Sequence, residues 1–321
     1  MMREQRRLGS ATRIGAMLVA LGAPALAGAV VLDLGAIGDL PGPGGGPAGS
    51  PHATFQPGDL FVSMRTGQVQ WWTPDGRLNA VLANAIQGKA EGMGFDAAGN
   101  LYVTHYCADA SFCLAGNTVE RFSSSGVSLG AFGGGYSCNP YAVAFDSAGR
   151  VLVGQADCTG DVLMFDAAGV RLEAFDVAPD QRGSARIELA PDGCTLYYTS
   201  QGPNVKRFDR CARRQMADFN AQPLPGGIGY GLRLLPDGGV LVAAAASIVR
   251  LDAAGRVTRL YDVAGEPDLW FGLDLAGDGT FWISNYGSSN LFRIDLAGGT
   301  VLSRISTGAP TTAIKDVLVR R

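Results

Sequence analysis

The sequence contains little histidine and little charge. Only 2 of its 321 residues are histidines, so catalysis that depends on a histidine base has almost no residue to use. Charged residues make up 17% of the chain, whereas an average soluble domain has ~25%. The formal net charge is −3 and no basic cluster is interleaved with aromatic residues, which argues against a nucleic-acid-binding surface.

The chain is instead rich in glycine, with 46 residues, and 47% of it is hydrophobic. This hydrophobic share is large enough to bury a sizeable core, and it excludes a disordered or collagen-like polymer. Sparse charge, frequent glycine and ample apolar content together predict an all-β chain with many tight turns.

Residues 1–29 predict an export signal. A positively charged start precedes an apolar stretch over 14–23 and a small-residue site at Ala25-Leu26-Ala27, so cleavage is expected near Ala27. We therefore expect an exported protein, periplasmic or secreted, with no membrane span in the mature chain. Two alternatives stay open. Residues 14–32 are uncharged and just long enough for an uncleaved anchor, and Arg6-Arg7 leaves a twin-arginine route open.

Residues 30–57 predict a flexible Gly/Pro-rich linker, because they include the run Pro41-Gly42-Pro43-Gly44-Gly45-Gly46-Pro47. The folded domain is expected over residues 58–321.

One segment recurs six times through this domain. Each copy begins with an apolar residue, has a second apolar residue three positions later, and ends in glycine or alanine. The copies are Val69–Gly76, Val119–Gly126, Val162–Gly169, Val205–Ala212, Ile248–Gly255 and Leu291–Gly298. Their last residues are 50, 43, 43, 43 and 43 positions apart, a spacing typical of repeat architectures. Residues three apart on a strand point to opposite faces, so each sheet is expected to be buried on both sides.

A hairpin pattern precedes each later copy, as in Gly92–Val103, where two short apolar runs flank a polar glycine turn. Each unit therefore predicts four strands, A to D, joined as the blade of a β-propeller. The first copy is preceded only by a strand B, at Leu60–Val62, and its strand A is expected at Ala313–Val317. The predicted fold class is an all-β six-bladed β-propeller that its C-terminal strand closes in the first blade.

The cysteines fit this map as disulfides, because an even number in an exported chain is typical of a disulfide framework. No Cys-x-x-Cys pair occurs, which disfavours a thiolate metal site. Loops A–B and C–D lie on one face of a propeller, and loops B–C and D–A lie on the other. Pairing within a face predicts the bonds Cys107–Cys113, Cys138–Cys158 and Cys194–Cys211.

Segments such as Glu91–Val103 and Asn117–Phe122 resemble NHL repeats and blades of the gluconolactonase, or senescence-marker-protein, superfamily of six-bladed propellers. Members of that family hold a divalent metal over the axis with Glu, Asn and Asp at the starts of inner strands. The corresponding positions here are Glu91, Tyr141, Ala185, Tyr230, Phe271 and Thr312. Only Glu91 matches, so the resemblance leaves it as the single candidate metal ligand.

Several of these positions hold aromatic residues, and we expect their rings on the face of the ring that carries the B–C and D–A loops. An aromatic-lined hollow with a few polar groups is the usual form of a small-molecule site. The candidate ligand-binding face comprises Glu91, His105, Tyr106, Tyr141, Gln155, Tyr230, Trp270, Phe271, Asn285 and Tyr286. The alternative is that these rings only cap the interfaces between blades.

A second column lies three positions further along strand A and reads Gly94, Ala144, Glu188, Arg233, Asp274 and Lys315. Its last four residues alternate in charge. Because buried charges need partners, this column predicts a ring of ion pairs near the axis.

Two functions follow from these observations. The first is a binding or scaffold module that engages a small molecule, glycan or protein through the aromatic face, as a monomer and with no catalytic residue or cofactor. The second is a divergent metal-dependent hydrolase or lyase, similar to the lactonases, with calcium or zinc held at Glu91.

Overall fold

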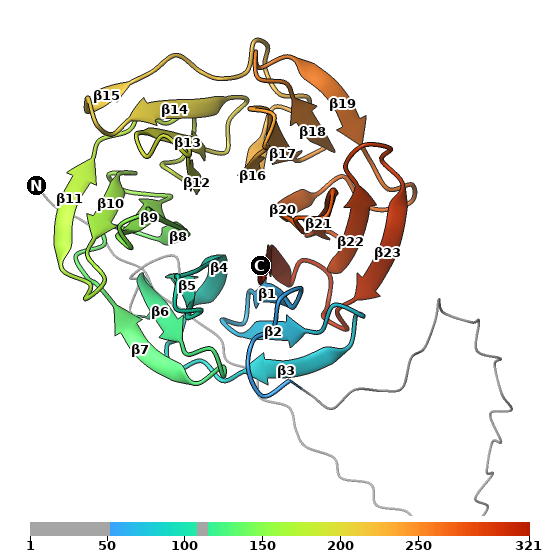
Figure 1. Ribbon diagram of the computed structural model, residues 1–321, viewed down its shortest axis with the longest axis horizontal. Coiled ribbons are helices and arrows are strands. Elements are labelled where there is room, and N and C mark those ends of the chain that lie inside the picture. Colours follow the sequence, from blue (N-terminus) through green and yellow to red (C-terminus); the bar gives the residue numbers. More distant parts are fainter. Residues whose placement is uncertain (1–51, 108–114) are drawn as a thin grey trace, which may run out of the picture. The chain divides into compact units, whose positions relative to one another are not determined.

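The computed structural model describes residues 52–107 and 115–321, which lie in one compact unit, Ser50–Arg321. These residues form six four-stranded antiparallel sheets, arranged as blades in a ring (Figure 1). The predicted six-bladed β-propeller is confirmed. Within the described ranges, no helix is long and apolar enough to cross a membrane.

Each blade runs from an inner strand A to an outer strand D. Blade one contains β24 (Ile314–Val319), β1 (Leu60–Met64), β2 (Val69–Trp72) and β3 (Leu78–Leu82). Blade two contains β4 (Lys89–Phe95), β5 (Leu101–Tyr106), β6 (Thr118–Phe122) and β7 (Ser128–Phe132). Blade three contains β8 (Pro140–Phe145), β9 (Val151–Gln155), β10 (Val162–Phe165) and β11 (Arg171–Phe175).

The remaining blades repeat this order. Blade four contains β12 (Arg186–Leu189), β13 (Thr195–Thr199), β14 (Val205–Asp209) and β15 (Arg214–Gln215). Blade five contains β16 (Gly229–Leu234), β17 (Val240–Ala244), β18 (Ser247–Leu251) and β19 (Val257–Tyr261). Blade six contains β20 (Trp270–Leu275), β21 (Thr280–Asn285), β22 (Asn290–Asp295) and β23 (Val301–Ser306).

The hydrophobic core lies between neighbouring blades, because the middle strands of each sheet are apolar on both faces. Between blades one and two, Phe61 and Trp71 pack with Met93, Leu101 and Phe122. Inner strands of successive blades also contact one another around the axis, β24 lying between β20 and β4. The inner strands of all six blades therefore surround the axis of the ring (Figure 1).

The first blade is closed by the two ends of the domain, as predicted. β24 pairs antiparallel with β1, with Leu60 opposite Val319 and Met64 opposite Ile314. Strand A thus reaches two residues beyond the predicted Val317.

Two glycines make room for an ion pair that crosses the axis. Arg186 Nη1 donates to Asp316 Oδ2 at 2.7 Å, and both side chains are almost fully buried. A Cβ on Gly92 would lie 2.2 Å from the carbonyl oxygen of Tyr141 and 2.9 Å from Arg186 Nη1, and one on Gly272 would lie 2.5 Å from both Cα and Oδ1 of Asp316. Larger residues at these positions would therefore clash with the neighbouring inner strands as well as with the pair.

Two of the predicted disulfides are confirmed. Cys138–Cys158 has a Cα–Cα distance of 5.4 Å, and Cys194–Cys211 has one of 5.3 Å. Each bond joins loops on a single face of the ring. The third predicted bond involves Cys113, which lies outside the described residues, so Cys107–Cys113 stays a prediction.

Candidate ligand-binding site at the axis

A pocket of about 180 Å³ opens on the face of the B–C and D–A loops, and we call it the axial pocket. Five of the six blades contribute to its walls. It is lined by Tyr141, Arg182, Gln201, Tyr230, Leu269, Phe271, Tyr286 and Lys315. Tyr230 and Phe271 stack with their ring centroids 4.6 Å apart, and Tyr286 lies 5.7 Å from Phe271. The result is a hollow with aromatic walls and two cations.

The pocket forms because the repeat places one residue of each inner strand at the same height. Lys315 follows Ile314, which pairs with Met64, in the same way that Phe271 follows Trp270, which pairs with Asn285. The column at the axis therefore reads Glu91, Tyr141, Ala185, Tyr230, Phe271 and Lys315.

The predicted sixth member of this column, Thr312, is wrong. Thr312 has a left-handed φ of 62° and donates its amide to the carbonyl of Tyr286, so it still belongs to the loop before β24. In the other blades a short turn joins strands A and B and sets their register. In blade one these strands come from opposite ends of the domain, and no turn in the sequence reveals how they pair.

Glu91 adjoins the lining residues Tyr141 and Lys315 but does not line the pocket itself, and it is 3% exposed. Its Oε1 lies 3.6 Å from Lys315 Nζ, while its Oε2 has no hydrogen-bond partner among the described residues. Burial raises the pKa of the Glu91 carboxyl, and the nearby charges of Lys315 and Arg186 act in the opposite direction. Burial and the negative charge of Glu91 also raise the pKa of the Tyr141 hydroxyl. The pocket thus adjoins a polar group that is buried and only partly satisfied.

Hydrogen bonds to Asp157 and Tyr106 fix the side chain of Arg182. Its Nε donates to Asp157 Oδ1 at 2.9 Å, and its Nη2 donates to Asp157 Oδ2 and to the hydroxyl of Tyr106. Burial alone would raise the pKa of Asp157, but hydrogen bonds from Arg182, Asn139 and Tyr106 hold it below its ordinary value. Asp157 therefore stays charged and fixes one edge of the guanidinium.

The structure divides the predicted face into two groups. Tyr141, Tyr230, Phe271 and Tyr286 line the pocket, Glu91 adjoins it, and Tyr106 packs against Tyr141. The other predicted residues are fully buried in the blades: His105, Gln155, Trp270 and Asn285.

The buried residues have structural partners. His105 Nε2 lies 3.0 Å from Glu120 Oε2, and both side chains are inaccessible to solvent. Gln155 accepts the amide of Ser137 at 2.6 Å, and Asn285 donates to the carbonyl of Pro267 at 2.6 Å. These side chains fix loops at the pocket face rather than entering the pocket.

Sequence reasoning missed both cations of the pocket. Lys315 was predicted in the column of charges instead of the pocket column, because the predicted register of strand A in blade one was wrong. Arg182 and Gln201 lie in loops between strands, where the repeat gives no signal for position.

The residues around Glu91 do not fit a hard divalent cation. Such an ion needs several oxygen ligands, usually carboxylates, but the nearest charged groups to Glu91 are those of Lys315 and Arg186. The described residues contain no group of three or more His, Cys, Asp or Glu side chains that could hold a metal.

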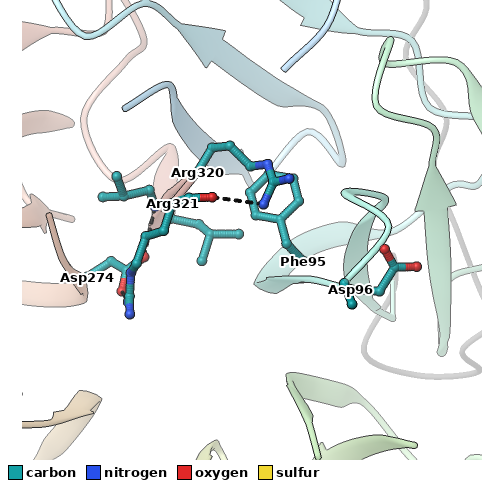
Figure 2. Close-up of a pocket in the computed structure, with 8 residues that line it drawn as sticks. Phe95, Asp96, Asp274, Arg320 and Arg321 are labelled. Carbon is teal, nitrogen blue, oxygen red and sulfur yellow. Dashed lines mark hydrogen bonds and ion pairs between the residues drawn. The ribbon is translucent and has the colours of Figure 1, made fainter. Parts of the chain in front are cut away.

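A second pocket, of about 300 Å³, lies at the other end of the inner strands (Figure 2). Arg320 lies over the ring of Phe95 at 5.1 Å, and Arg321 Nη2 donates to Asp274 Oδ1 at 2.5 Å. Asp274 also accepts from Arg233 at 2.7 Å. Charged residues of three blades therefore meet beside this pocket.

These contacts correct the predicted ring of charge. Lys315 does not belong to the predicted column of charges. Leu318 takes its place there, because Leu318 pairs with Phe61 of strand B in the same way that Asp274 pairs with Trp282. Arg321 supplies the cation beside Asp274 instead. The alternating charges of Glu188, Arg233 and Asp274 are retained.

The fold and the axial pocket define a β-propeller with a small hollow at its axis. No protein-family model matches the chain, and no curated protein matches its sequence. Solved propellers are similar in structure. A protein of unknown function from Bacteroides caccae matches with a TM-score of 0.64 and 15% identity, over 83% of this chain and 100% of that one.

Two further solved structures are similar in fold. A chain of the nidogen/laminin complex matches with a TM-score of 0.63 and 14% identity, over 81% of this chain and 97% of that one. A virginiamycin B lyase from Staphylococcus aureus matches with a TM-score of 0.53 and 13% identity, over 71% and 73%. Likeness at this identity concerns the fold, and membership of the NHL or gluconolactonase group stays a prediction.

Proposed function

We propose that this protein is a binding module that takes a small ligand in the axial pocket. The observation that carries the proposal is the convergence of Tyr141, Tyr230, Phe271 and Tyr286 with two cations around one cavity. Aromatic walls with a few placed polar groups are typical of small-molecule sites. Propellers serve many unrelated functions, so the proposal depends on this site and not on the fold.

The test is a set of monocyclic compounds, some anionic, some neutral and some cationic, added to the full chain and followed by ligand-observed NMR. We expect at least one class to bind, and we expect Tyr230→Leu to abolish that binding. The matched control is Tyr197→Leu, because Tyr197 packs on Phe219 outside the pocket. Failure of every class to bind, or equal binding by Tyr230→Leu, would contradict the proposal.

We further propose that the protein acts after export. The two disulfides support this, since disulfides persist mainly in oxidising compartments. Expression of the full chain in a bacterial host should yield a mature form that begins just after Ala27. Intact-mass measurement of the periplasmic fraction or culture medium checks the cleavage site, and an uncleaved, membrane-bound product would favour the anchor instead.

A further inference from the structure

The axial pocket has positive groups in its walls and no acidic ones. Arg182 and Lys315 belong to different blades, and no Asp or Glu is among the lining residues. Glu91 is not among the lining residues and is 3% exposed. A ligand in the pocket therefore contacts two cations in its walls and no carboxylate.

Arg182 presents unused donors. Asp157 takes its Nε and Nη2, and Tyr106 also accepts from Nη2. Among residues 52–107 and 115–321, no group accepts a hydrogen bond from Nη1. A guanidinium has five N–H donors in a rigid plane, so the Asp157 contact fixes its orientation and leaves the Nη1 edge for a ligand.

Lys315 is positioned by aromatic rings. Its Nζ lies 4.4 Å from the ring centroid of Phe271 and 4.5 Å from that of Tyr286. Its carboxylate neighbour, Glu91, lies at 3.6 Å. An ammonium has three N–H donors, and this one lies between the aromatic rings of the pocket and the Glu91 carboxylate.

The size of the cavity limits the ligand to about one ring. The volume is about 180 Å³, and an apolar cavity of about 150 Å³ is known to hold benzene. Tyr230 stacks on one face of Phe271, and the Lys315 ammonium lies over the other face, so a planar ring in the pocket can pack against Tyr230. Two cations in the wall of a cavity of this size suit one small anionic group attached to that ring.

We propose that the axial pocket selects small planar-ring carboxylates, with the carboxylate between Arg182 and Lys315 and the ring against Tyr230. This inference rests on the proposed binding function and adds its ligand class. A carboxylate carries one negative charge, whereas a phosphate monoester would bring a second charge close to the buried Glu91. A cationic ring compound would have to displace Lys315 from its two rings.

The test compares three probes of similar shape on the full chain by isothermal titration calorimetry at pH 7: benzoate, benzamide and benzylamine. We expect benzoate to bind at least about 10-fold more tightly than benzamide, because hydrogen bonds between charged groups are stronger than those to a neutral amide. Benzylamine should bind more weakly than either.

Arg182→Met should weaken benzoate binding about 10-fold and leave benzamide binding little changed. Arg182→Lys should retain more benzoate affinity than Arg182→Met. The matched control is Arg150→Met, since Arg150 also pairs with an aspartate, Asp146 at 2.7 Å, but outside the pocket. Unchanged melting temperatures would show that the variants are folded.

The outcomes separate this inference from the proposed function. Benzamide or benzylamine binding as tightly as benzoate, with loss in Tyr230→Leu, would overturn carboxylate selection and leave the binding module intact. Benzoate binding that Arg182→Met does not weaken would overturn the assigned role of Arg182 and with it the inference. Absence of binding by all three ring compounds, and by the wider set, would overturn both.

Discussion

At the scale of single residues, the most consequential contact is the ion pair that Arg186 and Asp316 form across the axis. Both side chains are almost fully buried, and Asp316 Oδ2 also accepts the amide of Met93 at 3.3 Å. Removing one member of a buried pair leaves the other charge without compensation. The charge of Arg186 also acts on Glu91 and Tyr141, so the pair adjoins the residues of the axial pocket.

Arg186→Met should lower the free energy of unfolding by about 3–5 kcal/mol, because it leaves the Asp316 carboxylate buried and unpaired. Urea unfolding followed by far-UV circular dichroism measures the change. The control is Arg256→Met, which breaks an exposed pair with Asp252 and should cost no more than about 1 kcal/mol. Equal losses in the two variants would show that the axial pair has no special weight.

Glu188 predicts a pH dependence of stability. Burial raises the pKa of its carboxyl from 4.5 to about 7, against the attraction of Arg233. The folded protein therefore keeps a proton that the unfolded chain releases as the pH rises from about 4.5 to 7. Stability should fall across this interval and level off above it. Asp274 and Arg321 also face this group and act on it in opposite directions.

Glu188→Gln should remove this part of the pH dependence. We expect the variant to gain on the order of 2 kcal/mol relative to the parent between pH 4.5 and 8. Urea unfolding at several pH values measures it. The control is Glu173→Gln on the outer strand β11, where the carboxylate pairs with Arg213, and this variant should keep the fall in stability between pH 4.5 and 7. A parent and a Glu188→Gln variant with parallel pH profiles would contradict the prediction.

At the scale of elements, β24 decides whether the ring closes. Ile314, Val317 and Val319 are buried against blade six and β1. A chain lacking Thr312–Arg321 should be insoluble or unfolded, because β1 would be left as an exposed inner edge. Solubility and a melting curve measure the effect. The control lacks only Arg321 and should stay folded; a normal melting curve for the longer truncation would refute the closure.

The same strand shows how far a sequence can define this site. The repeat predicts every blade, because each later strand A is tied to its strand B by a short turn that fixes the pairing. β24 has no such turn, and its pairing with β1 depends on packing between residues more than 250 positions apart, such as Ser63 Oγ and the amide of Asp316. The sequence therefore predicted Lys315 three positions too far along strand A, level with Gly94 instead of Glu91. Arg182 lies in a loop, where no periodicity locates it.

At the scale of the whole molecule, ring closure couples blades that are otherwise joined only to their neighbours. An open array of repeats can lose its end units separately, but here blades one and six share the core around Trp72, Trp282 and Ile314. Opening either blade exposes apolar surface on the other. The ring should therefore unfold as one cooperative unit.

The tryptophans make this testable, because all four lie in the two blades at the closure: Trp71 and Trp72 in β2, Trp270 in β20 and Trp282 in β21. Tryptophan fluorescence reports on blades one and six, whereas far-UV circular dichroism reports on all strands. With the disulfides intact, the two urea-unfolding curves should coincide. Fluorescence that changes at a lower urea concentration than circular dichroism would mean that the closure opens first and that the ring behaves as a linear array.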